Sequence, residues 1–108
     1  MKKPLRALPR AKKRKPGHYR FRLFTAGNGQ NSQIALANLR NLCRDYLGDG
    51  ATIETVDVVG DFQAAVRNNI LVTPALIMVE PRPTVTILGN LSDLPRVLVA
   101  LRVTGGDS

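Results

Sequence analysis

Residues 72–92 read VTPALIMVEPRPTVTILGNLS, and this stretch decides between the possible folds of the chain. Its two apolar runs, Val72–Val79 and Thr84–Leu88, are short and rich in residues that favour strands. The segment Pro81-Arg82-Pro83 separates the runs, since proline cannot donate to a sheet ladder, and Gly89-Asn90 ends the second run with a typical turn. The stretch therefore predicts two strands that form an antiparallel hairpin at the edge of a sheet.

The residues before this stretch predict a strand, a helix and a second strand. Tyr19–Phe24 alternates apolar and polar residues, which is typical of a strand with one buried face. A helix follows, with Asn31 or Ser32 as its N-cap, and Gly48-Asp49-Gly50 ends it. Its apolar residues recur at helical spacing and are Ala35, Leu39, Leu42, Cys43 and Tyr46. The β-branched run Ile53–Val59 predicts the second strand.

Two further helices are predicted from their caps. Asp61 is placed to cap a short helix that carries the apolar residues Phe62, Ala65 and Val66. Ser92 is placed to cap a last helix, with Pro95 in its first turn. The residues expected to face inward from this last helix are Leu94, Val97, Leu98 and Leu101.

The predicted order is β-α-β-α-β-β-α. A strand–helix–strand unit requires a right-handed parallel crossover, and the later hairpin adds antiparallel strands. This combination is an α/β sandwich of thioredoxin-like type.

Positive charge is concentrated at the start of the chain. The formal net charge is +8, yet Met1 to Arg22 hold 10 basic residues and no acidic one, while residues 23–108 hold 6 basic and 8 acidic residues. Residues 1–17 are predicted to be a disordered basic arm, residues 18–104 the folded domain and residues 105–108 a frayed end. Such an arm is usually a solvated tail or a weak, salt-sensitive ligand for polyanions such as nucleic acid.

The composition excludes several classes of protein. A single cysteine and a single histidine leave no disulfide within the chain, no CxxC pair and no His or Cys cluster for a metal, so no metal or cofactor is expected. No apolar run approaches the ~20 residues of a membrane-spanning helix, and the N-terminus lacks a secretory signal. A cytoplasmic location is expected.

Gly27–Ser32, between the first strand and its helix, is the strongest local candidate for a site. Its G-x-G-x-x-S spacing approaches a phosphate-binding fingerprint, but a plain turn and helix cap is the favoured interpretation. In a thioredoxin-like fold the nucleophilic cysteine would sit here, and this loop contains no thiol. Cys43 lies about three turns further along the helix, where it is expected to pack as a small hydrophobe. Catalysis is therefore not expected.

Thr73-Pro74 is the second candidate. In thioredoxin-like proteins a proline at this place is cis and exposes the preceding backbone to a partner or to glutathione. The alternative is an ordinary trans proline at the start of a strand.

Several of these segments resemble the KaiB family of small bacterial circadian-clock proteins. Leu23–Asn28, followed by Asn31-Ser32, Ala35-Leu36 and Leu39, is similar to the family opening L-Y-V-A-G-N-x-x-N-S-x-x-A-L-x-x-L. The likeness continues through the following segments: Val56-Asp57-Val58, Ile70–Pro74, Pro81, Pro83 and Gly89–Ser92. It covers about Tyr19 to Val103, nearly everything but the arm.

The resemblance implies a binding protein rather than an enzyme. KaiB proteins dock on the KaiC ATPase ring, and related domains sit at the N-terminus of a clock-output histidine kinase. The implied partner is therefore a KaiC-like ATPase or such a kinase. The residues expected to bind this partner are Gly27, Asn28, Asn31, Ser32, Thr73 and Pro74. Clock KaiB also has two folds, a tetrameric ground state of order β-α-β-β-α-α-β and a thioredoxin-like monomer that binds KaiC.

This chain departs from the family pattern in the stretch that distinguishes these two folds. Val85 and Thr86 replace two arginines that are common in the family, which makes this segment a better strand and favours the thioredoxin-like monomer over the tetramer. The residues expected to determine the fold are Pro74, Pro81, Pro83, Val85, Thr86 and Gly89.

Two alternative functions remain open at this point. One is a glutathione-binding or transferase-like module, based on Ser32, Thr73-Pro74 and Ser92-Asp93, which hold the thiol, backbone and γ-glutamyl groups in such domains. The other is a polyanion tether that acts through the basic arm.

Overall fold

The computed structural model describes residues 18–48 and 50–103. The predicted arm at 1–17 and frayed end at 105–108 lie outside these residues. The strands are β1 (Tyr19–Thr25), β2 (Ala51–Asp57), β3 (Ala75–Glu80) and β4 (Val85–Leu88). The helical segments are α1 (Gln30–Leu42), the π-helical turn η2 (Cys43–Leu47), α2 (Phe62–Arg67) and α3 (Leu94–Ala100). This order confirms the predicted β-α-β-α-β-β-α arrangement.

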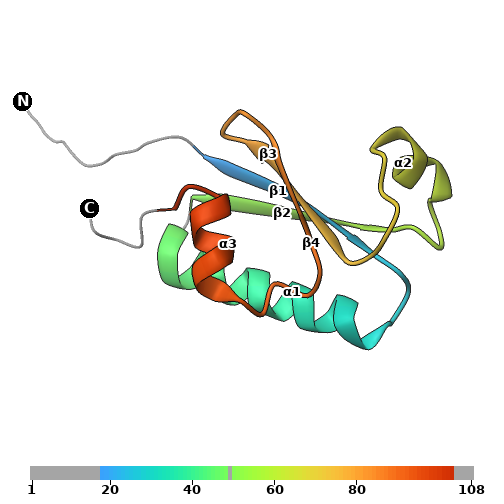
Figure 1. The fold of residues 1–108 in the computed structure, drawn as a ribbon, viewed down its shortest axis with the longest axis horizontal. Helices are drawn as coiled ribbons and strands as arrows, with labels where there is room; N and C mark the ends of the chain where they lie inside the picture. Colours follow the sequence, from blue (N-terminus) through green and yellow to red (C-terminus); the bar gives the residue numbers. More distant parts are fainter. Residues whose placement is uncertain (1–17, 49, 104–108) are drawn as a thin grey trace, which may run out of the picture.

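The four strands form one mixed sheet in the order β2-β1-β3-β4 (Figure 1). β1 pairs with β2 in parallel, while β1–β3 and β3–β4 are antiparallel. The hairpin predicted from residues 72–92 is therefore present, and its second strand is one edge of the sheet. β3, which begins directly after Thr73-Pro74, lies between β1 and β4 and is an interior strand.

Two apolar clusters lie on opposite faces of the sheet. The larger cluster joins α1 and α3 to one face, with Phe21 and Leu23 of β1 and Leu76 and Met78 of β3 at its centre. The smaller cluster lies under α2 on the other face and contains Phe24, Ala64 and Ala75. Side chains of successive strand residues point to opposite faces, so the neighbours Leu23 and Phe24 are buried in different clusters.

The ends of the elements differ from the sequence prediction at several places. β2 ends at Asp57 rather than Val59 because its parallel partner β1 ends at Thr25, which pairs with Asp57. The helix expected to reach Tyr46 does so through η2, and Gly48 ends it with a φ of 58°.

Two of the three predicted helix caps are wrong. Asp61 caps α2 as expected, since its side chain accepts a hydrogen bond from the Ala64 N–H. Gly29, not Asn31 or Ser32, is the N-cap residue of α1. Asp93, not Ser92, caps α3 by accepting from the Arg96 N–H.

Burial of the short helices also differs from the prediction. In α2, Ala64 and Ala65 are buried, whereas Phe62 and Val66 are exposed. In α3, Val97 is buried as expected and Leu94 is exposed. Among residues 18–48 and 50–103, no helix has both the length and the apolar character needed to cross a bilayer.

Candidate partner-binding site

The candidate residues gather at one end of the sheet, where β1 and β2 end and β3 begins. Phe24, near the end of β1, pairs with Ala75 at the start of β3, so the loop after β1 and the Thr73-Pro74 pair lie at the same end. The peptide bond between Thr73 and Pro74 is cis. Pro74 is buried and Thr73 is half-buried. The two candidate segments therefore lie at one end of the fold, and we call this region the sheet-end site.

Hydrogen bonds connect the two candidate segments through the turn after β4. The Gly89 N–H donates to the Pro74 carbonyl at 2.9 Å. The next residue, Asn90, donates from Nδ2 to Oδ1 of Asn31 at 3.3 Å. Nδ2 of Asn38 in turn donates to the Asn90 carbonyl at 2.9 Å. Gly89-Asn90 thus bridges Pro74 to the first turn of α1.

Ser32 holds the loop between β1 and α1 in place. Its side chain is buried, and its Oγ accepts a hydrogen bond from the Ala26 N–H at 3.2 Å. Gln33 Nε2 donates to the Asn28 carbonyl at 2.9 Å across the same loop. These contacts explain why Ser32 is not the helix cap, because its hydroxyl is turned back toward the end of β1.

Asp57 is a structural residue of this end that the sequence did not single out. Its Oδ1 accepts from the Gly27 N–H at 2.9 Å and from the Val59 N–H at 3.0 Å. These two bonds lower the pKa of the Asp57 carboxyl, since both stabilise its charged form. Asp57 therefore ties the β1–α1 loop to the β2–α2 loop. No signal in the sequence identified this role, because the run Ile53–Val59 placed Asp57 inside the predicted strand.

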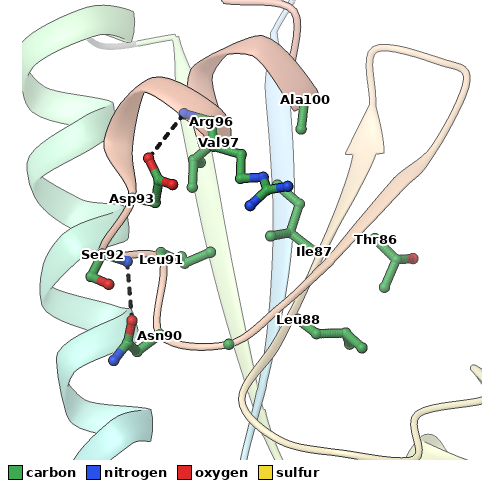
Figure 2. Close-up of a pocket in the computed structure, with 11 residues that line it drawn as sticks. Thr86, Ile87, Leu88, Asn90, Leu91, Ser92, Asp93, Arg96, Val97 and Ala100 are labelled. Atoms are coloured by element: carbon green, nitrogen blue, oxygen red, sulfur yellow. Dashed lines mark hydrogen bonds between the residues drawn. The ribbon is translucent and has the colours of Figure 1, made fainter.

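A shallow hollow and a larger groove lie on different parts of the molecule. The hollow, about 170 Å³, is lined by Thr25, Gly27, Asn28, Ser32, Gln33, Leu36 and Thr55. The groove, about 490 Å³, lies between β4 and α3 and includes Ser92 and Asp93 (Figure 2). Ser32 and Ser92-Asp93 therefore line different cavities, and Thr73 and Pro74 line neither of the two. A glutathione-binding role, the alternative based on these residues, stays a prediction.

The one thiol of the chain lies outside the sheet-end site. Cys43 is buried at the end of α1, as expected for a small hydrophobe, and burial raises the pKa of its thiol to about 11. A thiol with this pKa remains protonated near neutral pH and is a poor nucleophile. Over residues 18–48 and 50–103, no three His, Cys, Asp or Glu side chains are grouped so as to hold a metal ion.

Arg20 and Arg22 belong to the sheet rather than to a basic arm. Arg22 Nε lies 2.9 Å from Oε1 of Glu54 on β2, and Arg20 Nη1 lies 3.8 Å from Oε2 of Glu80 on β3. Both pairs are largely exposed, so their contribution to stability is small. The proposed polyanion tether concerns residues 1–17, which lie outside the described residues.

Comparisons with known proteins identify the family. The family model described as the KaiB domain matches residues 22–103. Circadian clock protein KaiB3 of Synechocystis sp. is 39% identical over 83 residues, which span 77% of this chain and 81% of that protein. A circadian clock oscillator protein KaiB from a Synechococcus species is 42% identical over 84 residues, which span 77% of this chain and 76% of that protein.

Solved structures show the same fold at lower identity. The N-terminal domain of Synechococcus elongatus SasA superposes with a TM-score of 0.67 at 17% identity, covering 89% of this chain and 94% of that one. Fasciola hepatica thioredoxin superposes with a TM-score of 0.63 at 15% identity, covering 82% of this chain and 83% of that one. These structures confirm the thioredoxin-like fold, and the sequence matches show that the chain belongs to the KaiB family.

Proposed function

We propose that the chain is a non-enzymatic protein-binding module that regulates a KaiC-like ATPase or a clock-associated sensor kinase, in circadian or related signalling. The relatives that are 39% and 42% identical over 77% of this chain are named as circadian clock proteins, which supports a role of this kind. In this proposal the free chain is a monomer, and binding takes place through the end of the sheet that carries the loops around α2.

The observation that carries this proposal is a group of large apolar side chains left exposed on and beside α2. Leu71 is 93% exposed, Val59 74% and Phe62 68%, and Val66 and Val72 are exposed by more than half. We call these five residues the α2 patch. Apolar side chains gathered on one short helix and its flanking loops are typical of a protein–protein contact surface.

The geometry of α2 explains why this patch forms. The helix has only six residues and packs on the sheet through Ala64 and Ala65, whose small side chains allow a close approach. Phe62 and Val66 are four residues apart and therefore lie on one side of the helix. Since α2 packs on the sheet through Ala64 and Ala65, Phe62 and Val66 stay exposed and are free to contact a partner.

Polar groups of the sheet-end site lie next to the patch in the hydrogen-bonded structure. Asp57 accepts from Val59 of the patch and from Gly27 of the site, so one carboxylate connects them. An apolar centre with a polar rim is the usual composition of a protein interface. Gly27, Asn28 and Asn31 would supply that rim, with Thr73 and Pro74 fixing the start of β3.

The chemistry of the site supports binding in preference to catalysis. Ser32 already accepts the Ala26 N–H, and the only thiol of the chain is the buried Cys43. Neither residue has an activating base within the hydrogen bonds of the described residues. A nucleophilic role would require both groups to be displaced from their present surroundings.

The proposal is tested by sedimentation velocity with the purified chain and a KaiC-like ATPase from the same cell. We expect the chain to sediment as a monomer alone and to move with the ATPase in the mixture. A second run with the sensor kinase distinguishes the two partners. No association with either protein at about 50 μM, which corresponds to less than about 6 kcal/mol of binding free energy, would overturn the proposal.

A further inference from the structure

The sheet has two edges, and they differ in charge. The β2 edge carries Glu54 and Asp57, whereas the β4 edge, Val85-Thr86-Ile87-Leu88, carries no charged residue. Charged side chains on an edge strand discourage pairing with other chains. β4 is therefore the edge whose free backbone groups are open to a further strand.

The register shows which backbone groups of β4 are free. Hydrogen-bonded and non-hydrogen-bonded pairs alternate along an antiparallel ladder. The Gly89 N–H donates to the Pro74 carbonyl, so the hydrogen-bonded positions recur every second residue back along β4. Ile87 and Val85 are therefore the residues of β4 whose backbone groups bond to β3. The N–H and C=O groups of Thr86 and Leu88 then face away from β3, toward the open edge.

A groove with one cationic side chain lies beside this edge. Its walls are β4 and α3, and its apolar lining includes Ile87, Leu91 and Val97. Figure 2 shows the Arg96 side chain extending from α3 toward Ile87. Arg96 is exposed and forms no ion pair within the part of the chain that the structure describes, because Asp93 is bonded to its backbone N–H instead.

We propose that the β4 edge accepts an extended segment of a partner protein as an antiparallel strand, with a glutamate opposite Ile87 that pairs with Arg96. Bonds to Thr86 and Leu88 hold the added backbone. The residue between these two bonds lies opposite Ile87 and points to the same face of the sheet, which is the face of α3 and the groove. Charge complementarity with Arg96 then selects a carboxylate at this position.

A second copy of the chain does not fit this edge as well. β4 contains no acidic residue, so a copy pairing through its own β4 brings no carboxylate to Arg96. An acidic partner segment satisfies both the free backbone groups and the free guanidinium. The inference is independent of the partner proposed for the α2 patch.

The test titrates the ¹⁵N-labelled full chain with a five-residue peptide, acetyl-Thr-Val-Glu-Val-Thr-amide. The amide chemical shifts of the chain are measured at each peptide concentration. We expect shifts that saturate and are largest at Thr86, Leu88 and Arg96. A matched peptide with lysine in place of glutamate should bind at least about fivefold more weakly, since it replaces an attraction with a repulsion. Equal binding of the two peptides, or shifts confined to the sheet-end site, would overturn the proposal.

Two variants separate the role of the Arg96 side chain from the role of the β4 backbone. Arg96→Glu places a glutamate at the third position of α3, where it is compatible with the helix start, and it should reverse the preference in favour of the lysine peptide. Thr86→Pro removes one outward N–H while sparing the β3 ladder, and it should abolish binding of both peptides. An Arg96→Glu chain that still prefers the glutamate peptide contradicts the proposed ion pair.

A truncated chain ending at Val103 tests whether the chain's own C-terminal residues occupy the groove. We expect its Thr86, Leu88 and Arg96 amide shifts to match those of the full chain without peptide. If removal of residues 104–108 alone moves these three shifts, the occupant is the chain's own terminus and the partner proposal is wrong.

Discussion

Val97→Ala is the substitution that tests most directly how α3 packs on the sheet. Val97 is 4% exposed and belongs to the larger apolar cluster, together with Leu76 and Leu101. Replacing it with alanine removes two buried methyl groups. Their transfer free energy is about 1.6 kcal/mol, and the cavity left behind raises the cost to about 2–3 kcal/mol.

Val99 on the same helix is a matched control, because it is the same residue type and is 77% exposed. Both substitutions gain the same helix propensity from alanine, so the difference between them reports burial alone. We expect Val99→Ala to change the free energy of unfolding by no more than about 0.5 kcal/mol.

Urea unfolding followed by circular dichroism measures this difference. With a denaturant slope of about 1.5 kcal/mol/M, a loss of about 2–3 kcal/mol lowers the midpoint of Val97→Ala by about 1.3–2 M. The midpoint of Val99→Ala should stay within about 0.3 M of the parent. Equal midpoints for the two variants would refute the packing of α3 on the sheet through Val97.

Three other features give further predictions. Asp61→Ala removes the cap of α2 and should lower stability by about 1 kcal/mol in thermal unfolding; an unchanged Tm contradicts the cap. The pKa of Asp57 is lowered in the folded state, so its contribution is present above the unfolded value of about 3.9 and lost as the pH falls through the folded pKa. The Tm difference between the parent and Asp57→Asn should therefore be largest above about pH 5 and shrink in stronger acid, and a difference that grows in acid refutes this sign. The Cys43 thiol, with a pKa of about 11, should react with a disulfide reagent far more slowly in the folded chain than in denaturing urea, and equal rates would show that it is not buried.

The order of elements was predictable because each element has a local signal. Tyr19–Phe24 alternates over a full strand, and the two proline-bounded runs around Pro81 and Pro83 are each too short for a helix. Asp61 was correctly predicted as a cap, since its carboxylate accepts from the N–H of Ala64, only three residues further along the chain. Each of these signals involves residues that are close together in the chain, so it can be recognised from the sequence without the structure.

The features that sequence reasoning missed depend on contacts between distant segments. Ser32 has the residue type of a cap, but its hydroxyl bonds Ala26 because the β1–α1 loop turns back on itself. Asp57 bonds Gly27, which is 30 positions away in the chain, and no local pattern indicates this pair. The exposure of Phe62 was likewise hidden, because an apolar residue on a helix is usually assigned to the core.

The segments of the candidate site could be named from the sequence, but their arrangement could not. The glycine spacing drew attention to Gly27–Ser32, and the predicted thioredoxin-like order drew attention to Thr73-Pro74. The bridge through Gly89 and Asn90 becomes visible only once the strand order is known. The role of these residues in binding a partner remains a prediction.

The most direct test of partner recognition by the α2 patch is a binding titration of Phe62→Ser with the KaiC-like ATPase or sensor kinase that associates with the parent chain. The control is Val99→Ser, which also replaces an exposed apolar side chain but lies on α3, on the opposite face of the sheet. We predict that Phe62→Ser weakens binding at least about tenfold, or about 1.4 kcal/mol, and that Val99→Ser leaves it unchanged. Equal affinity of both variants and the parent would contradict recognition through the α2 patch.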